Sequence, residues 1–160
     1  MADMLVRLYP LPCDPDLEPD LNEQGIVIKQ ALAPDMSKVI AFTEENGHPG
    51  WADEIRVCFS NQPVSCYIAV KDRRIIGFGC YEATARGFFG PTLIAASERR
   101  KGVGKALLLR CLGSLRALGY AYAFIGWPAD NAIHFYQNAC GATLIPDEGH
   151  GVYSRMAGVD

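Results

Sequence analysis

Residues 97–109 read SERRKGVGKALLL, in which four cationic residues alternate with two glycines before an apolar run. An apolar stretch, FFGPTLIAA at 88–96, precedes this segment, and apolar residues recur every three or four positions from Val103 to Leu118. These patterns predict a strand, a tight loop and a long helix with one buried face, closed by Gly119. Unpaired N–H groups and the positive end of a helix dipole meet at such a helix start. The loop is therefore predicted to bind an anion, and phosphate is the obvious ligand.

The spacing of the glycines excludes two common phosphate loops. A P-loop requires glycine at position 99, where Arg99 stands, and a hydroxyl residue at position 106, where Ala106 stands. A dinucleotide-binding fingerprint requires a third small residue at position 107, where Leu107 stands. What remains is the pattern R-x-x-G-x-G, from Arg99 to Gly104.

This pattern resembles the acetyl-CoA loop of the GNAT superfamily of acyl-CoA-dependent N-acyltransferases. A second segment, IHFYQNACGA at 133–142, resembles the family's second motif, and the order of predicted elements from about residue 26 is similar as well. The resemblance implies a mixed α/β fold with a central, mostly antiparallel sheet, two splayed strands and flanking helices. It also implies acetyl-CoA as the co-substrate.

The resemblance further implies which residues bind the cofactor. The backbone of strand 92–94 would pair with the pantetheine arm, and the loop amides would hold the pyrophosphate. The implied cofactor-binding residues are Thr92, Leu93, Ile94, Arg99, Arg100, Lys101, Gly102, Val103, Gly104, Lys105 and Asn131. Tyr136 matches the tyrosine that protonates the leaving thiolate. The alternative for Tyr136 is a packed core residue of an amphipathic helix.

The base that takes the proton of the attacking amine is not supplied by either motif. Glu82 is the only acid between positions 75 and 96, and it follows an apolar run where burial would raise the pKa of its carboxyl group toward that of a useful base. It is a candidate catalytic base, and an ion pair with Arg86 is the alternative role.

Two further acids, Asp53 and Glu54, stand beside Trp51 in the segment GWADE. They either line the entrance for a cationic acceptor or are ordinary solvated acids at a helix start. The three histidines, at positions 48, 134 and 150, show no metal-ligand spacing, so no metal site is predicted.

The composition is that of a globular protein: 160 residues, of which 49% are hydrophobic and 21% charged. A net charge of −3 gives no overall attraction for nucleic acid, so the basic loop must act locally. The six cysteines are widely separated and are expected to be reduced, and no run of 18 apolar residues predicts a membrane helix. We therefore expect a cytoplasmic protein without nucleic-acid or membrane partners.

The chain is predicted to have two regions. Residues 1–25, with four prolines among acids, would form a surface arm without a helix or a central strand, and residues 26–160 would form the GNAT-like domain. Within this domain we predict a strand at 26–31, helices at 34–45 and 51–59, and a hairpin formed by 65–70 and 75–83. Residues 142–146 and 152–156 would form a last hairpin.

The predicted function is N-acetyl transfer from acetyl-CoA to a primary amine by direct attack, with Tyr136 as general acid and Glu82 as candidate base. The alternative is a non-catalytic acyl-CoA-binding sensor. The acceptor would be a small-molecule or peptide amine, and the acids near Trp51 favour a small cation. A homodimer remains open at this stage.

Overall fold

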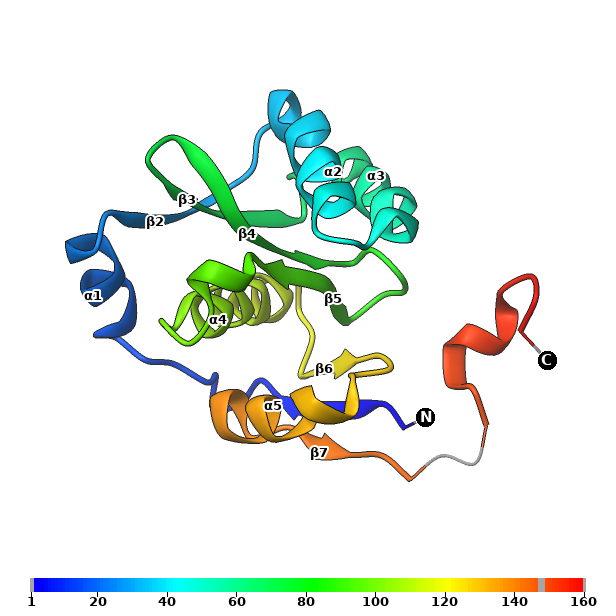
Figure 1. Ribbon diagram of the computed structural model, residues 1–160. Coiled ribbons are helices and arrows are strands. Elements are labelled where there is room, and N and C mark those ends of the chain that lie inside the picture. The colour runs from blue at the N-terminus through cyan, green and yellow to red at the C-terminus, as the bar shows by residue number, and fades with distance from the viewer. Residues whose placement is uncertain (1, 147–148, 160) are drawn as a thin grey trace.

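The computed structural model describes residues 2–146 and 149–159, and its centre is a seven-stranded sheet in the order β2-β3-β4-β5-β6-β1-β7 (Figure 1). The strands are β1 (Met4–Arg7), β2 (Ile26–Gln30), β3 (Cys66–Lys71), β4 (Arg74–Tyr81), β5 (Phe88–Ile94), β6 (Tyr122–Ile125) and β7 (Thr143–Leu144). Strands β5 and β6 run parallel, and the other neighbouring pairs are antiparallel. The predicted mixed, mostly antiparallel sheet is confirmed.

Helices cover both faces of this sheet (Figure 1). They are α1 (Leu17–Glu23), α2 (Met36–Glu45), α3 (Ala52–Ser60), α4 (Val103–Ala117) and α5 (Ile133–Cys140), with short 3-10 turns at Ala33–Asp35, Pro49–Trp51, Ala96–Glu98, Asp130–Ala132 and Gly151–Arg155. In the part of the chain that the structure describes, no helix is long and apolar enough to cross a membrane.

Strand β4 shows how the two helical layers share one sheet. Its Phe78 packs with the buried residues of α2 and α3, and the Phe42 and Phe78 rings meet edge to face at 6.2 Å. On the other face, a Cβ at Gly79 would lie 3.4 Å from Leu107 Cβ of α4. Because side chains alternate along a strand, the glycine lets α4 approach one face while the aromatic ring fills the other.

Both ends of α4 lie where the sequence predicts them. Gly102 is the N-cap, with φ +92°, and Gly119 follows the C-cap with φ +104°. The Gly119 N–H donates to the Arg116 carbonyl, and the Tyr120 N–H donates to the Leu115 carbonyl. This left-handed ending satisfies carbonyls that the helix would otherwise leave free.

The expectation that residues 1–25 hold neither a helix nor a central strand is wrong. Strand β1 lies inside the sheet between β6 and β7, and α1 follows it. Met4, Val6 and Leu8 are fully buried, so the segment has the alternation of a strand before the first of the prolines. Pro19 is in the first turn of α1, where a missing N–H costs no helical bond.

The predicted last hairpin is also wrong. Strand β7 pairs with β1, and Gly151–Arg155 forms a 3-10 turn. Residues 147 and 148, in the expected connection, lie outside the described residues. Strand β7 is the edge strand of the sheet, and the segment expected to pair with it instead forms a turn that places the Tyr153 ring on Trp127, with ring centroids 4.1 Å apart.

The parallel pair β5 and β6 separates soon after it forms. Paired positions are Phe88 with Phe124 and Phe89 with Ile125, after which the two strands diverge. Gly90 and then Pro91 follow in β5, and Pro91 has no N–H to donate to a ladder. The residues of β5 beyond this point therefore keep one backbone edge without a strand partner among the described residues, as the predicted splay requires.

Candidate active site

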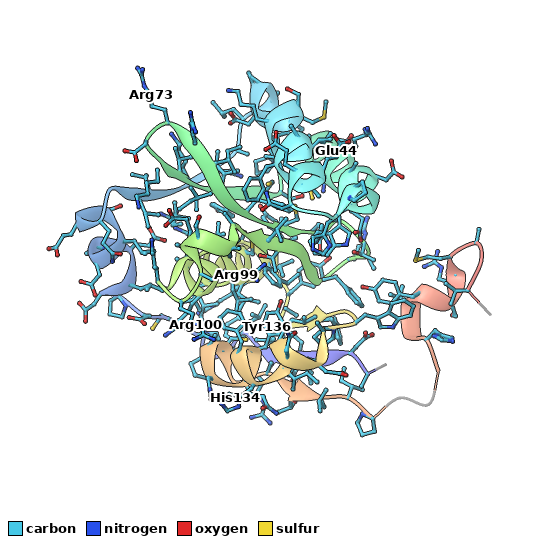
Figure 2. The ribbon with its side chains drawn as sticks, viewed as in Figure 1. Glu44, Arg73, Arg99, Arg100, His134 and Tyr136 are labelled. Carbon is cyan, nitrogen blue, oxygen red and sulfur yellow. The ribbon has the colours of Figure 1, made fainter. Side chains whose placement is uncertain are left out.

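A cavity of about 640 Å³ lies between β5, the basic loop, the start of α4 and α5. Figure 2 shows Arg99, Arg100 and Tyr136 in this region, between the ribbons of α4 and α5. Of the predicted cofactor residues, the cavity is lined by Thr92, Leu93, Ile94, Arg99, Arg100, Gly102, Gly104, Lys105 and Asn131. Lys101 does not line it, and Val103 is buried in the core beneath the loop.

The first turn of α4 presents backbone donors at this cavity. The first helical hydrogen bond described runs from the Ala106 N–H to the Gly102 carbonyl at 3.0 Å, and no side chain caps the helix. In the described part of the chain, the N–H groups of residues 103–105 have no partner. Together with the helix dipole they form a local positive site that suits a phosphate.

The four cations of the loop differ in how freely they can meet a ligand. Lys101 Nζ pairs with Glu98 Oε2 at 2.7 Å, and Lys105 Nζ pairs with Asp14 Oδ2 at 2.7 Å. The hydrogen bonds from these lysines lower the pKa of the Glu98 and Asp14 carboxyl groups. Arg99 and Arg100 have no carboxylate within ion-pair distance among the described residues. The two arginines are thus the loop cations without an ion pair, and Arg99 Nε donates to the Ile94 carbonyl of β5 at 3.3 Å.

The two glycines of the motif serve different purposes. A Cβ at Gly102 would lie 2.7 Å from Leu17 Cδ1 of α1, and the backbone there has φ +92°. A Cβ at Gly104 would meet only ordinary contacts, 3.6 Å from Ile94 Cγ1 and 3.7 Å from Phe135 Cζ. Gly102 is therefore required by the fold, whereas Gly104 keeps the cavity open beside the helix start.

Tyr136 is both packed and part of the cavity wall. Only 7% of the residue is exposed, and its ring meets the edge of Phe89 with centroids 6.2 Å apart. Burial raises the pKa of its phenol to about 12. The group is protonated at neutral pH and has a proton to give. Tyr136 is therefore packed, as the core interpretation expects, and it also lines the cavity, whereas its role as a general acid stays a prediction.

The structure does not bring Glu82 to this cavity. One carboxylate oxygen accepts from the Gly87 N–H at 2.5 Å, and the other accepts from the Tyr120 hydroxyl at 3.2 Å. Glu82 instead lines a separate cavity of about 380 Å³ with Tyr67 and Ser114. Its described bonds close the loop between β4 and β5, and no ion pair with Arg86 is found among the described residues.

The two acids of the GWADE segment, Asp53 and Glu54, have different surroundings. The side chain of Asp53 is 92% exposed and pairs with Arg56 at 2.7 Å, as a solvated helix start would. Glu54 is half-buried, accepts a hydrogen bond from the Thr84 hydroxyl and lines a third cavity. That cavity shares Phe89 with the first one.

Comparison with known proteins identifies the family. Residues 28–142 match the family model described as the acetyltransferase (GNAT) family. The chain belongs to this family. No curated protein sequence matches the chain.

Three solved structures show the same GNAT fold. A glucosamine N-acetyltransferase region of a fungal multi-domain enzyme superimposes with a TM-score of 0.72 at 12% identity, over 90% of this chain and 19% of that one. A GCN5-related N-acetyltransferase from Sphaerobacter thermophilus gives 0.67 at 19%, over 90% and 48%. A GNAT acetyltransferase from Brucella melitensis, solved with acetyl-CoA, gives 0.50 at 15%, over 69% and 80%. The chain thus spans less than half the length of the first two.

Two lining residues of this cavity lie outside both sequence motifs. His48 and Phe89 line it from two different segments of the chain. The His48 ring stacks on Trp51 with centroids 4.2 Å apart, which links the 640 Å³ cavity to the cavity beside Glu54. No local pattern marks such residues, because only the folded chain brings them together.

Proposed function

We propose that this GNAT chain transfers the acetyl group of acetyl-CoA to a primary amine. The observation that carries the proposal is one cavity that joins a strand edge without a strand partner, a helix N-terminus with two arginines that have no ion pair among the described residues, and a buried protonated tyrosine. Family membership and the acetyl-CoA complex of the Brucella melitensis structure support an acyl-CoA ligand.

The pantetheine arm, the pyrophosphate and the thioester of acetyl-CoA each have a suitable part of the cavity. The unpaired edge of β5 offers N–H and C=O groups to the amides of the pantetheine arm. The start of α4, with Arg99 and Arg100, suits the pyrophosphate, because backbone N–H groups and guanidinium groups both donate to phosphate oxygens. The thioester would then lie toward Phe89 and Tyr136.

In the reaction, the neutral amine attacks the carbonyl carbon of the thioester. The C–N bond forms, the C–S bond breaks, and the CoA thiolate takes the proton of the Tyr136 phenol. The amine nitrogen loses one proton, which restores the phenol through water, so the products are the acetamide and free CoA thiol. The role of the protein is to hold the thioester and to supply a proton where negative charge develops.

Replacing Tyr136 with phenylalanine tests this proposal. The variant keeps the ring and its packing, so we expect unchanged melting temperature and acetyl-CoA affinity, while kcat falls at least about tenfold. Because an unprotonated leaving group affects the transition state, the loss should appear in kcat and not in KM for acetyl-CoA.

The exposed Tyr122 offers a matched control, and Tyr122→Phe should keep full turnover. Activity is measured as CoA release over a library of amines. Full kcat in Tyr136→Phe would remove the tyrosine from the mechanism. Binding of acetyl-CoA without CoA release for any amine would contradict transfer and leave a non-catalytic acyl-CoA-binding protein.

A further inference from the structure

The third cavity, of about 220 Å³, lies next to the proposed thioester position. Trp51 and Glu54 line it from the start of α3, Trp127 from the loop after β6, and Tyr153 from the last 3-10 turn. In Figure 1 this red turn lies on the same side of the molecule as the yellow loop after β6. Phe89 lines this cavity and the cofactor cavity, so a ligand here would adjoin the proposed reaction centre.

The electrostatic character of this cavity is negative. Glu54 has one carboxylate oxygen bonded to the Thr84 hydroxyl, and its other oxygen has no described partner. Asp3 lies nearby and accepts the backbone N–H of Trp127 at 3.1 Å. Burial, and then the charges of Glu54 and Asp3, raise the pKa of Tyr153 to about 12. No lysine or arginine occurs among the described residues that line the cavity.

Aromatic rings form its walls. The Trp127 and Tyr153 rings stack at 4.1 Å, and the Trp51 ring stacks on His48 at 4.2 Å. This arrangement depends on Gly126, because a Cβ there would lie 2.2 Å from the Tyr153 hydroxyl oxygen. Aromatic faces attract cations, most strongly where water is excluded.

One hydrogen-bond donor of these walls is unused. The indole Nε1 of Trp127 is buried and has no partner among the described residues. Buried donors are nearly always satisfied in native proteins. Because Trp127 lines the cavity, a ligand bound there is one source of the missing acceptor atom.

We propose that this cavity holds the acceptor as a small hydroxylated alkylamine, whose ammonium group pairs with Glu54 and whose oxygen accepts from Trp127. The inference rests on the proposed function, since it assigns the acceptor class of the same site. A volume of about 220 Å³ corresponds to roughly seven waters of liquid, which fits a short amine and excludes a long peptide segment inside the cavity.

Tryptophan fluorescence of the full chain gives a direct test. The chain has two tryptophans, and both line this cavity, so their emission reports on its occupancy without any turnover. The probes are aminobutanol, butylamine and butanediol, each with its functional groups at the chain ends. We expect aminobutanol to bind most tightly, butylamine less tightly, and the uncharged butanediol not at all. Equal binding of butanediol and butylamine would overturn the proposal.

Variants assign the two contacts. Glu54→Gln should weaken aminobutanol binding at least about tenfold, which is 1.4 kcal/mol, whereas Asp53→Asn, a change in the neighbouring exposed acid, should have no effect. In Trp127→Phe, binding is measured by the fluorescence of the remaining Trp51. This variant should lose the preference for aminobutanol over butylamine. Wild-type affinity in Glu54→Gln would refute the ion pair. If Glu54→Gln does not fold, the three probes on the wild type still decide the charge preference.

Calorimetry with acetyl-CoA separates this inference from the proposed function. If the protein binds acetyl-CoA but the third cavity does not discriminate among the three probes, the acceptor class alone is overturned. Selective amine binding in a protein that does not bind acetyl-CoA overturns the proposed function, and with it the assignment of the bound amine as an acceptor.

Discussion

At Gly104 the main chain comes to the cofactor cavity with no side chain in between. A Cβ there meets no close protein atom, so the two methyl groups of a valine would extend into the cavity rather than into the core. We expect Gly104→Val to weaken acetyl-CoA binding at least about tenfold, because the pyrophosphate loses its close approach to the helix start. Isothermal titration calorimetry measures the effect.

Gly113 provides the control on the same helix. Its added Cβ would have only Leu11 Cδ2 within reach, at 4.0 Å, far from the cavity. Gly113→Val imposes the same β-branched cost on α4 and should leave the affinity unchanged. Equal affinities in both variants would show that the ligand does not approach the backbone at this point. Gly102 is less suitable, because its replacement also collides with Leu17.

The sequence predicts some residues of the site well and others poorly for a physical reason. The loop and Tyr136 belong to contiguous patterns, and the structure places almost all of these residues around one cavity. Glu82 and Glu54 are isolated acids, and their roles depend on the residues that contact them in the folded chain. The bonds of Glu82 to Gly87 and Tyr120, and the position of Glu54 beside Trp127, come from distant segments that no local spacing encodes.

At the scale of elements, β1 and α1 both lie in the N-terminal segment for which the sequence pattern predicts neither a helix nor a central strand. The alternation of buried and exposed residues in β1 covers only four residues, and the four prolines that follow favour a segment without regular structure. In the structure the buried residues of β1 join the cluster that contains Leu112, Leu115 and Tyr136. The helices α2, α3 and α4 and the β3–β4 hairpin were predictable, because each has its own apolar period and its own stop signal.

Leu8→Ala tests whether this N-terminal segment is an integral part of the core. Leu8 is fully buried directly after β1, and its N–H donates to the Ala121 carbonyl at 3.0 Å. Removing its side chain should lower the free energy of unfolding by about 2–5 kcal/mol. Denaturant unfolding measures the change. Leu32→Ala, at a residue that is 68% exposed, should cost less than about 0.5 kcal/mol. Similar small losses in both variants would mean a loosely attached arm.

At the scale of the whole molecule, the chain has a net charge of −3, whereas the acetyl-CoA ligand that we propose is a polyanion. The field of the molecule opposes the approach of the ligand, so the local charges of Arg99 and Arg100 must overcome it. We expect the double variant Arg99→Gln/Arg100→Gln to bind acetyl-CoA more weakly and with a flatter dependence on salt, because exposed charges are screened within about 8–10 Å at physiological ionic strength.

A variant without the two lysines of the same loop serves as the control for the arginine variant. Lys101 and Lys105 are already paired with Glu98 and Asp14, so Lys101→Gln/Lys105→Gln should change the salt dependence less than the arginine variant does. Calorimetric titrations at several salt concentrations give, for each variant, the slope of the acetyl-CoA affinity against salt concentration. Equal slopes in the wild type and the arginine variant would contradict the assignment of these charges to phosphate.

The position of β1 between β6 and β7 also governs the order in which the molecule can be assembled. Met4 pairs with Ile125 and Leu144, so the residues of β1 are synthesised long before their partners in β6 and β7. Contacts so distant in sequence form slowly, because the whole intervening loop must close before they give any stabilisation. The half-sheet formed by β2–β5 can pair without them. During synthesis, β1 therefore needs protection from premature pairing, and the wall of the cavities beyond β5 is completed last.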